Sequence, residues 1–114
     1  MADCLFCGIV AGDVPADVVQ RGQHTVAFRD INPQAPTHVL VVPKDHVDDA
    51  AALDAGHGEM LAELFTTART VAHADGVDAS GFRLVFNVGE DARNTVGHLH
   101  LHVLGGRSLE WPPG

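Results

Sequence analysis

Three histidines occupy every second position in a short segment near the end of the chain: His98, His100 and His102. If this segment is a β-strand, its alternate side chains point to one face, so the imidazoles share one face and Leu99 and Leu101 share the other. Same-face neighbours on a strand lie about 6.6 Å apart. Two imidazoles can therefore converge on one atom, and three can line one groove.

This histidine face has three interpretations. The first is a set of polar residues on a solvated sheet face, which is disfavoured because random polar faces do not repeat one titratable group. The second is a metal site, because pairs of imidazoles on a strand bind zinc. The third is nucleophilic catalysis, in which one neutral imidazole attacks phosphorus while its neighbours orient it and protonate the leaving group. Under the third interpretation His100 is the preferred nucleophile, since it has a same-face histidine on each side.

The two cysteines form the pair Cys4-Leu5-Phe6-Cys7. A redox site would need a strand before the pair and a longer helix after it, but only three residues precede Cys4. The pair could also be two small buried apolar residues. A closed zinc site needs four ligands, so two more donors are required. His46, just after the expected strand 37–42, and His98 are the candidates.

Composition limits the possible partners. The chain has 114 residues, of which 46% are hydrophobic, and this predicts a single domain over residues 1–114. Lys plus Arg is 7 and Asp plus Glu is 15, which gives a net charge of −8. We therefore expect no nucleic-acid partner, because nothing offsets the charge of a phosphate backbone. A small anionic ligand would have to be met locally, by backbone N–H groups or histidines.

Neither a membrane partner nor export is expected. The longest aliphatic run, residues 39–42, is far shorter than the roughly 20 residues of a membrane-spanning helix. The first residues contain Asp3 where a signal peptide would have basic residues, and no long apolar stretch follows. The expected location is the cytoplasm.

The elements that must position these residues follow from the spacing of apolar side chains. Helical spacing over Met60–Ala72 predicts one long helix that ends near Gly76, and residues 4–12 predict a short helix ending at Gly12. Strands are predicted at Val18–Val19, Thr25–Phe28, Thr37–Val42, Phe82–Phe86 and His98–Leu104. Short connections and a single crossing helix predict an α+β domain built on a five-stranded antiparallel sheet.

The histidine segment and its surroundings resemble the histidine triad (HIT) family, and within it the Hint branch of nucleotide-binding proteins. His98–Leu104 matches the pattern His-φ-His-φ-His-φ-φ in full, where φ is hydrophobic. Asp30–His38 and Val42–His46 are similar to the loop and strand that precede the motif in the family. The end of the chain, Gly105–Gly114, is similar to that of the Hint branch.

The resemblance implies a role for each histidine of the site. His100 would be the nucleophile that takes a nucleotidyl group from the α-phosphate, His102 would contact the phosphate or its leaving group, and His38 would lie beside them. The implied activity is a hydrolase or transferase acting on purine nucleoside phosphoramidates or related adenylates, with an AMP-like ligand. Two other functions stay open, namely a nucleotide-binding regulatory protein with incidental turnover and a zinc-binding module without catalysis.

The resemblance also implies a binding site for the rest of a nucleotide. Asp30 would bind the ribose hydroxyls as an acceptor, although it could instead be a turn residue. Asn87 and Thr95 would form hydrogen bonds near the phosphate. Departures from the family pattern at Thr95, Gly97 and Arg29 leave the substrate preference open. An apolar slot for the base, or alternatively plain core, would be formed by Phe6, Ile9, Phe28, Ile31 and Leu40.

A zinc ion is implied in the same way, with Cys4, Cys7, His46 and His98 as its ligands. This zinc would be structural and would fix the strand that carries His100. No organic cofactor is implied.

The tail predicts an association between two chains. Trp111 is the only tryptophan and lies beside two prolines, so it is either exposed, which is unfavourable, or buried on its own sheet or against another chain. The resemblance implies a homodimer in which the long helix and a central strand pair across a two-fold axis. The result would be a ten-stranded sheet, with Trp111 approaching the neighbouring subunit's site.

Overall fold

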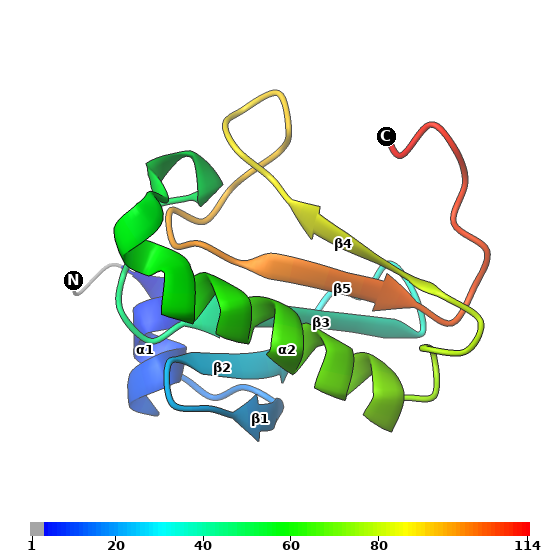
Figure 1. Ribbon diagram of the computed structural model, residues 1–114, viewed down its shortest axis with the longest axis horizontal. Helices are drawn as coiled ribbons and strands as arrows, with labels where there is room; N and C mark the ends of the chain where they lie inside the picture. Colours follow the sequence, from blue (N-terminus) through cyan, green and yellow to red (C-terminus); the bar gives the residue numbers. More distant parts are fainter. Residues whose placement is uncertain (1–3) are drawn as a thin grey trace.

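One antiparallel sheet organises the computed structural model, which describes residues 4–114 (Figure 1). Its strands follow the order β1-β2-β3-β5-β4, so β3 is central and β1 and β4 are the edges. The α+β class and the five strands predicted for this part of the chain are confirmed. The strands are β1 (Val18–Arg21), β2 (Thr25–Arg29), β3 (Thr37–Pro43), β4 (Phe82–Phe86) and β5 (Leu101–Gly105).

The long helix α2 (Gly58–Ala74) covers one face of the sheet (Figure 1). Its apolar stripe packs against the residues of β3 and β5 that point to that face, and each fully buried aliphatic side chain contributes about 1.5–3 kcal/mol. Phe65 departs from the predicted stripe, because it is 43% exposed and packs edge-on against Phe86 of β4. The buried cluster contains Ala27, Val39, Val41, Leu64, Ala68, Val71, Leu99, Leu101 and Val103.

The short helix α1 (Leu5–Ala11) closes part of the opposite face. It begins at Cys4, whose Sγ accepts a hydrogen bond from the backbone N–H of Cys7 at 3.2 Å. It ends at Gly12, which has a φ of 83°, a conformation that favours glycine. A second buried cluster forms between α1 and the sheet, from Phe6, Ile9, Val26, Phe28, Leu40 and Val42.

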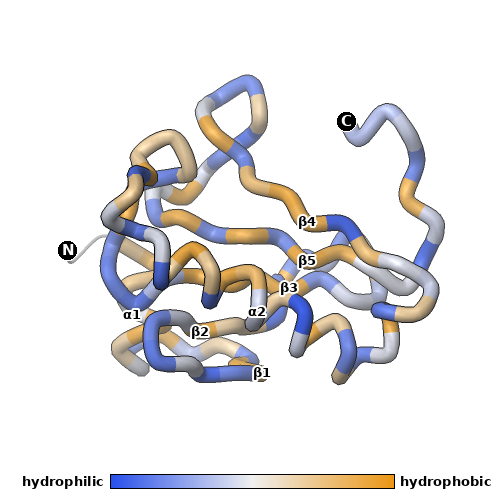
Figure 2. The backbone as a smooth tube through the Cα atoms, viewed as in Figure 1, coloured by the Kyte–Doolittle hydropathy of each residue, from blue (hydrophilic) through white to orange (hydrophobic). Residues whose placement is uncertain are grey.

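The alternation along the last strand follows the prediction, but the strand starts later. Figure 2 shows hydrophobic and hydrophilic residues alternating along β5. Strand β5 begins at Leu101 rather than at His98. The preceding residues bond elsewhere: Leu99 N–H donates to the Val47 carbonyl at 2.6 Å, and His98 Nε2 lies 2.9 Å from the Pro43 carbonyl. These contacts hold His98 against the end of β3 and Leu99 against the segment that follows it.

The connection from β3 to α2 contains two 3₁₀ turns, Ala50–Ala52 and Ala55–His57, that the sequence did not predict. The side chains of Asp49 and Asp54 cap them by accepting hydrogen bonds from Ala51 and Gly56 N–H groups. Short turns of this kind are fixed by such local caps rather than by apolar periodicity.

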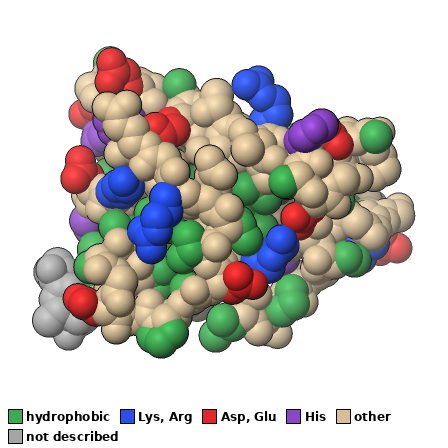
Figure 3. Space-filling model, turned by 90° about the horizontal axis from the view of Figure 1, so that it is seen from below, with side chains coloured by type: hydrophobic (Ala, Val, Ile, Leu, Met, Phe, Trp, Pro, Cys, Tyr) green, Lys and Arg blue, Asp and Glu red, His purple; other side chains and the backbone are tan. Residues whose placement is uncertain are grey.

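The surface carries few cations. Figure 3, which views the molecule from below Figure 1, shows Lys and Arg side chains interspersed with Asp and Glu. No helix within residues 4–114 has the length and apolar character needed to cross a membrane.

Candidate active site and metal centre

The face of the sheet opposite α2 carries a row of cross-strand neighbours. Phe28 of β2 pairs with Leu40 of β3, which pairs with His102 of β5, which pairs with Val85 of β4. Since alternate residues share a face, His38 stands on the same side as Leu40. The row thus has an apolar end at Phe28, and His38 and His102 stand on the same face farther along it.

Hydrogen bonds determine where the protons of this histidine pair lie. The Gln34 backbone N–H donates to His38 Nδ1 at 3.0 Å, so a neutral His38 carries its proton on Nε2. That nitrogen lies 2.9 Å from His102 Nδ1 and 3.4 Å from Asp30 Oδ2. His102 Nδ1 therefore accepts the bond, and the proton of His102 is on Nε2.

Burial keeps both of these histidines neutral. Burial, with His100 and His38 beside it, lowers the pKa of His102 to about 4. Burial also lowers the pKa of His38, although the nearby Asp30 carboxylate opposes this effect. At neutral pH His102 is thus a neutral hydrogen-bond donor through Nε2. The side-chain nitrogen of Asn87 lies 3.4 Å from it and is also a donor, so these two groups do not bond each other.

His100 is oriented by the backbone just before it. Its Nδ1 lies 2.8 Å from the His98 carbonyl oxygen. A carbonyl can only accept, so Nδ1 carries the proton and Nε2 keeps a free lone pair. The ring packs edge-on against Phe6 and His102, with centroids 5.1 and 5.0 Å away. This arrangement holds the ring in one orientation and leaves Nε2 unprotonated.

A cavity of about 440 Å³ lies over this face. Asp30 lines it while its Oδ1 accepts from the Asn32 N–H at 2.9 Å, so its position at the cavity and its turn role coexist. His38 lies behind His102 and does not line the cavity. The predicted residues that do so are Phe6, Ile9, Phe28, Asp30, Ile31, Leu40, Asn87, Thr95, His100 and His102.

Two predicted binding residues are strongly exposed. Ile31 borders the cavity but is 99% exposed, so it adds no buried surface within one chain. Trp111 is 82% exposed and lies beside β4, outside the cavity. The alternative in which Trp111 is buried on its own sheet is therefore wrong.

The sequence interpretation missed several lining residues. Arg93 and Val96 reach the cavity from the loop between β4 and β5, and residues 14–16 reach it from the segment after α1. Arg93 is the only basic residue in the polar stretch 89–94. This isolated charge is the sequence feature that could have identified Arg93 as a lining residue.

Four further side chains converge at the N-terminus of α1. Cys4 and Cys7 come from α1 and its cap, His46 follows β3, and His98 precedes β5. The two sulfurs lie 3.3–3.5 Å from Nδ1 of each histidine. In a tetrahedral zinc site, sulfur and nitrogen ligands stand about 3.6 Å apart. The cluster thus has the donor set and spacing that zinc requires.

The surroundings of the cluster prepare its histidines for a metal. His98 Nε2 donates to the Pro43 carbonyl, and His46 Nε2 donates to Asp48 Oδ1, both at 2.9 Å. In its neutral form each histidine therefore turns an unprotonated Nδ1 toward the sulfurs. The hydrogen bond to Asp48 raises the pKa of His46. Burial lowers the pKa of His98, which keeps it neutral. Burial alone would raise the pKa of Cys4, but hydrogen bonds with Cys7 and His46 lower it.

A second cluster, Asp30, His38 and His102, also has three potential ligands close together. The Gln34 N–H places the His38 proton on Nε2, the atom that faces the other two groups. A metal there would compete with that proton, so the arrangement favours a hydrogen-bonded network.

Comparison with known proteins places these features in a wider group. Residues 11–109 match the family model described as the HIT domain. An uncharacterized HIT-like protein of Synechococcus elongatus is 43% identical over 98% of this chain and 97% of its own length. The 14 kDa zinc-binding protein of Zea mays is 42% identical over 96% of this chain and 87% of its own.

Solved structures agree with this result. The crystal structure of a HIT family hydrolase from Legionella pneumophila superposes with a TM-score of 0.96, is 46% identical, and covers 98% of this chain and 100% of that one. A zinc-bound histidine triad family protein from Mycobacterium smegmatis superposes with a TM-score of 0.81 at 32% identity, over 94% of this chain and 77% of that one.

Proposed function

The chain belongs to the HIT domain family, and on this basis we propose that it is a nucleotide-binding hydrolase or transferase of the Hint type. It cleaves nucleoside phosphoramidates or adenylates at the α-phosphate through a nucleotidyl-histidine intermediate. One observation carries the proposal: His100 Nδ1 donates to the His98 carbonyl, which leaves Nε2 with its lone pair on a ring whose centroid lies 5.0 Å from that of His102, in the same cavity. A nucleophile and an anion-stabilising donor thus meet in one cavity.

The nucleotide takes its orientation from the two ends of the cavity. The base lies at the apolar end, against Phe6 and Phe28, whose rings pack edge-on with centroids 5.3 Å apart. Asp30 accepts from the ribose hydroxyls, and Asn87 and Thr95 donate to the phosphate. Leu40, Ile9 and the exposed Ile31 complete the apolar surface.

The reaction has two displacement steps. The lone pair on His100 Nε2 forms a bond to the α-phosphorus, and the bond from phosphorus to the leaving amine breaks, with its electron pair going to the amine nitrogen. One proton from the solvent protonates His102, and the resulting imidazolium passes its Nε2 proton to the amine nitrogen. A bound phosphate makes this transfer possible, because its negative charge raises the pKa of His102 above the value of about 4 in the free protein.

Water completes the cycle. Its oxygen attacks the phosphorus, the bond between phosphorus and His100 breaks, and the electron pair returns to Nε2. The nucleoside monophosphate leaves with the new hydroxyl, and the second water proton returns through His102 to the solvent. Between these steps, His38 holds neutral His102 in the tautomer whose proton is on Nε2.

Zinc has a structural role in the proposal. Cys4, Cys7, His46 and His98 would hold it, and zinc would supply only a rigid tetrahedral link. His98 joins the two sites, since its side chain belongs to the cluster and its carbonyl orients His100.

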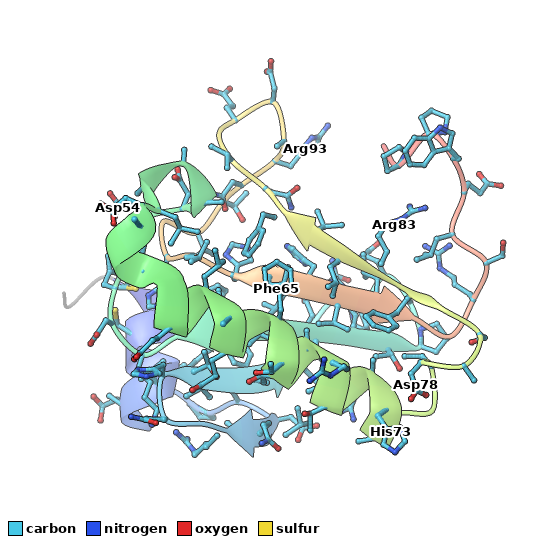
Figure 4. All side chains as sticks on the ribbon, viewed as in Figure 1. Asp54, Phe65, His73, Asp78, Arg83 and Arg93 are labelled. Carbon is cyan, nitrogen blue, oxygen red and sulfur yellow. The ribbon has the colours of Figure 1, made fainter. Side chains whose placement is uncertain are left out.

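The proposed assembly is a homodimer. A ten-stranded sheet requires pairing at a sheet edge, and β4 is such an edge, whereas the central strand β3 is already paired on both sides. The exposed Phe65, labelled in Figure 4, packs against Phe86 of β4. The exposed Trp111 lines a shallow pocket together with residues of β4. A two-fold contact at β4 would bury Phe65 and bring each tail toward the other chain's site.

Two assays separate this proposal from its alternatives. With an adenosine phosphoramidate, the wild-type protein should release AMP, and His100→Ala should lower kcat by roughly a thousandfold or more while AMP still binds. His73→Ala, a control at an exposed histidine on α2, should keep full activity. AMP binding without turnover would indicate a regulatory protein, and neither binding nor turnover would indicate a zinc module.

A further inference from the structure

Two arginines supply the permanent positive charge at the cavity, Arg29 and Arg93. Arg29 is already paired, because its guanidinium donates to both carboxylate oxygens of Asp75 at 2.9 and 3.0 Å. Within residues 4–114, Arg93 makes no ion pair and no side-chain hydrogen bond. In a chain of net charge −8, Arg93 is thus the guanidinium left for an anionic ligand of this cavity.

The position of Arg93 associates it with the phosphate end of the cavity. It lies in the loop between β4 and β5, which projects beyond the sheet (Figures 1 and 4). The proposed phosphate-binding residues Asn87 and Thr95 stand on either side of it in the chain. The apolar residues proposed for the base come from α1, β2 and β3 instead.

The backbone at Arg93 adopts a conformation that glycine would adopt more easily. Its φ is 62°, and it is the one residue other than glycine with a positive φ in the described chain. The Arg93 N–H donates to the Glu90 carbonyl at 2.9 Å, and the Asn94 N–H donates to the Gly89 carbonyl at 3.1 Å. A long charged side chain kept at a strained position beside a cavity suggests a use for that side chain.

We propose that Arg93 is a specificity residue that binds an anionic group on the leaving-group side of the substrate. The preferred substrates would then be nucleoside phosphoramidates whose amine carries a carboxylate or a phosphate. This inference rests on the proposed function, and it assigns the substrate class of the same site. A guanidinium suits both anions, because it offers paired N–H donors to two oxygens.

Matched substrates test the inference. The conjugates of AMP with alanine and with alaninamide differ by one carboxylate, and a third conjugate with aminoethyl phosphate carries a phosphate. For the wild type, kcat/KM should be highest for one of the two anionic conjugates, which identifies the anion. Arg93→Gly should lower the ratio of kcat/KM for that conjugate over the alaninamide conjugate by about tenfold, and Arg93→Lys, which keeps the charge but not the paired donors, should lower it less.

Two controls separate charge from fold. Arg69→Gln removes an exposed charge on α2, outside the cavity, and should leave the ratio unchanged. The thermal midpoint of Arg93→Gly should equal or exceed that of the wild type, since glycine relieves the strain at φ 62°.

The outcomes distinguish a failure of the role proposed for Arg93 from a failure of the proposed function. If the wild type turns over the conjugates but Arg93→Gly leaves the ratio unchanged, or lowers all substrates equally, the inference is overturned and the proposed function stands. Failure of the wild type to turn over any conjugate overturns both.

Discussion

At the scale of single residues, two backbone groups determine the chemistry of the site. The Gln34 N–H fixes the tautomers of His38 and His102, and the His98 carbonyl fixes the tautomer of His100. In the proposed mechanism, the three identical side chains thereby become a positioning residue (His38), a donor (His102) and a nucleophile (His100). Environment rather than residue type separates their roles.

The sequence predicted the identity of these histidines but not their protonation. Alternation placed Leu99, Leu101 and Val103 in the core under α2, which left the histidines on the other face. The bonds to Gln34 and His98 depend on backbone conformation, which no spacing rule reveals. The position of Arg93 was missed for the same reason, because a loop has no periodicity.

The lowered pKa of His102 predicts that acid destabilises the protein. The pKa is about 4 in the folded state against 6.5 for a free histidine. The unfolded chain therefore binds more protons between these values, and stability falls as pH decreases from 6.5 toward 4. This difference is worth up to about 3 kcal/mol. We expect His102→Asn to flatten the dependence of the free energy of unfolding on pH over that window, measured by urea denaturation.

His24→Asn provides the control for this measurement. His24 lies on the surface, 3.8 Å from the exposed carboxylate of Glu59, and its variant should keep the wild-type slope. Acid can also release the metal, but this effect is the same in the wild type, His102→Asn and His24→Asn, so it does not change the comparison. Equal slopes for His102→Asn and the wild type would contradict the neutral, buried state of His102.

At the scale of elements, the metal cluster joins parts of the chain that no continuous strand connects. Its ligands come from the start of α1, the segment after β3 and the segment before β5. Apolar periodicity predicted α1, α2 and the strands, but it extended the last strand to His98, three residues too early. The extra residues bond to Pro43 and Val47 instead, a tertiary preference that overrides local pattern.

Removal of one cysteine should release the zinc and loosen these elements. The wild type, purified without chelators, should contain about one zinc per chain, and Cys7→Ser should contain almost none. Cys7→Ser should also lose several kcal/mol of stability, because the unsatisfied ligands no longer hold α1 to the sheet. Its kcat should fall more than its affinity for AMP, since the His98 carbonyl orients the nucleophile.

A histidine outside the cluster gives the comparison. His24→Gln should keep both the zinc and the stability of the wild type. Full zinc content in Cys7→Ser, measured by atomic emission, would disprove the ligand assignment.

At the scale of the whole molecule, the two faces of the sheet have different roles. The face under α2 supplies the larger core, and the other supplies a smaller core with the cavity beside it. The exposed edge β4, with Phe65 and Trp111 beside it, gives the molecule a surface suited to a second copy. The sequence predicted which residues lie on each face of the sheet, because alternation along a strand separates buried from exposed side chains. It did not predict that Phe65 is exposed, since this depends on where α2 lies over the sheet.

The dimer proposal predicts that a single substitution at the contact separates the two chains. Wild-type protein at micromolar concentration should have twice the 12.0 kDa mass of one chain in light scattering. Phe65→Glu should be monomeric, because it buries a charge against the two-fold contact. Gln20→Glu, which adds the same charge on the opposite edge strand β1, should remain dimeric. A wild type of 12.0 kDa would refute the dimer and the role of Trp111 with it.

The covalent intermediate tests the central claim most directly. Wild-type protein is mixed with an adenosine phosphoramidate, quenched within one turnover and digested under conditions that preserve phosphohistidine, and its peptides are mapped by mass spectrometry. The account predicts one adenylyl group per chain on His100, formed and lost at rates that match AMP release. An adenylyl group on another residue would contradict the account. So would complete release of AMP within the first turnover without any adenylylated protein.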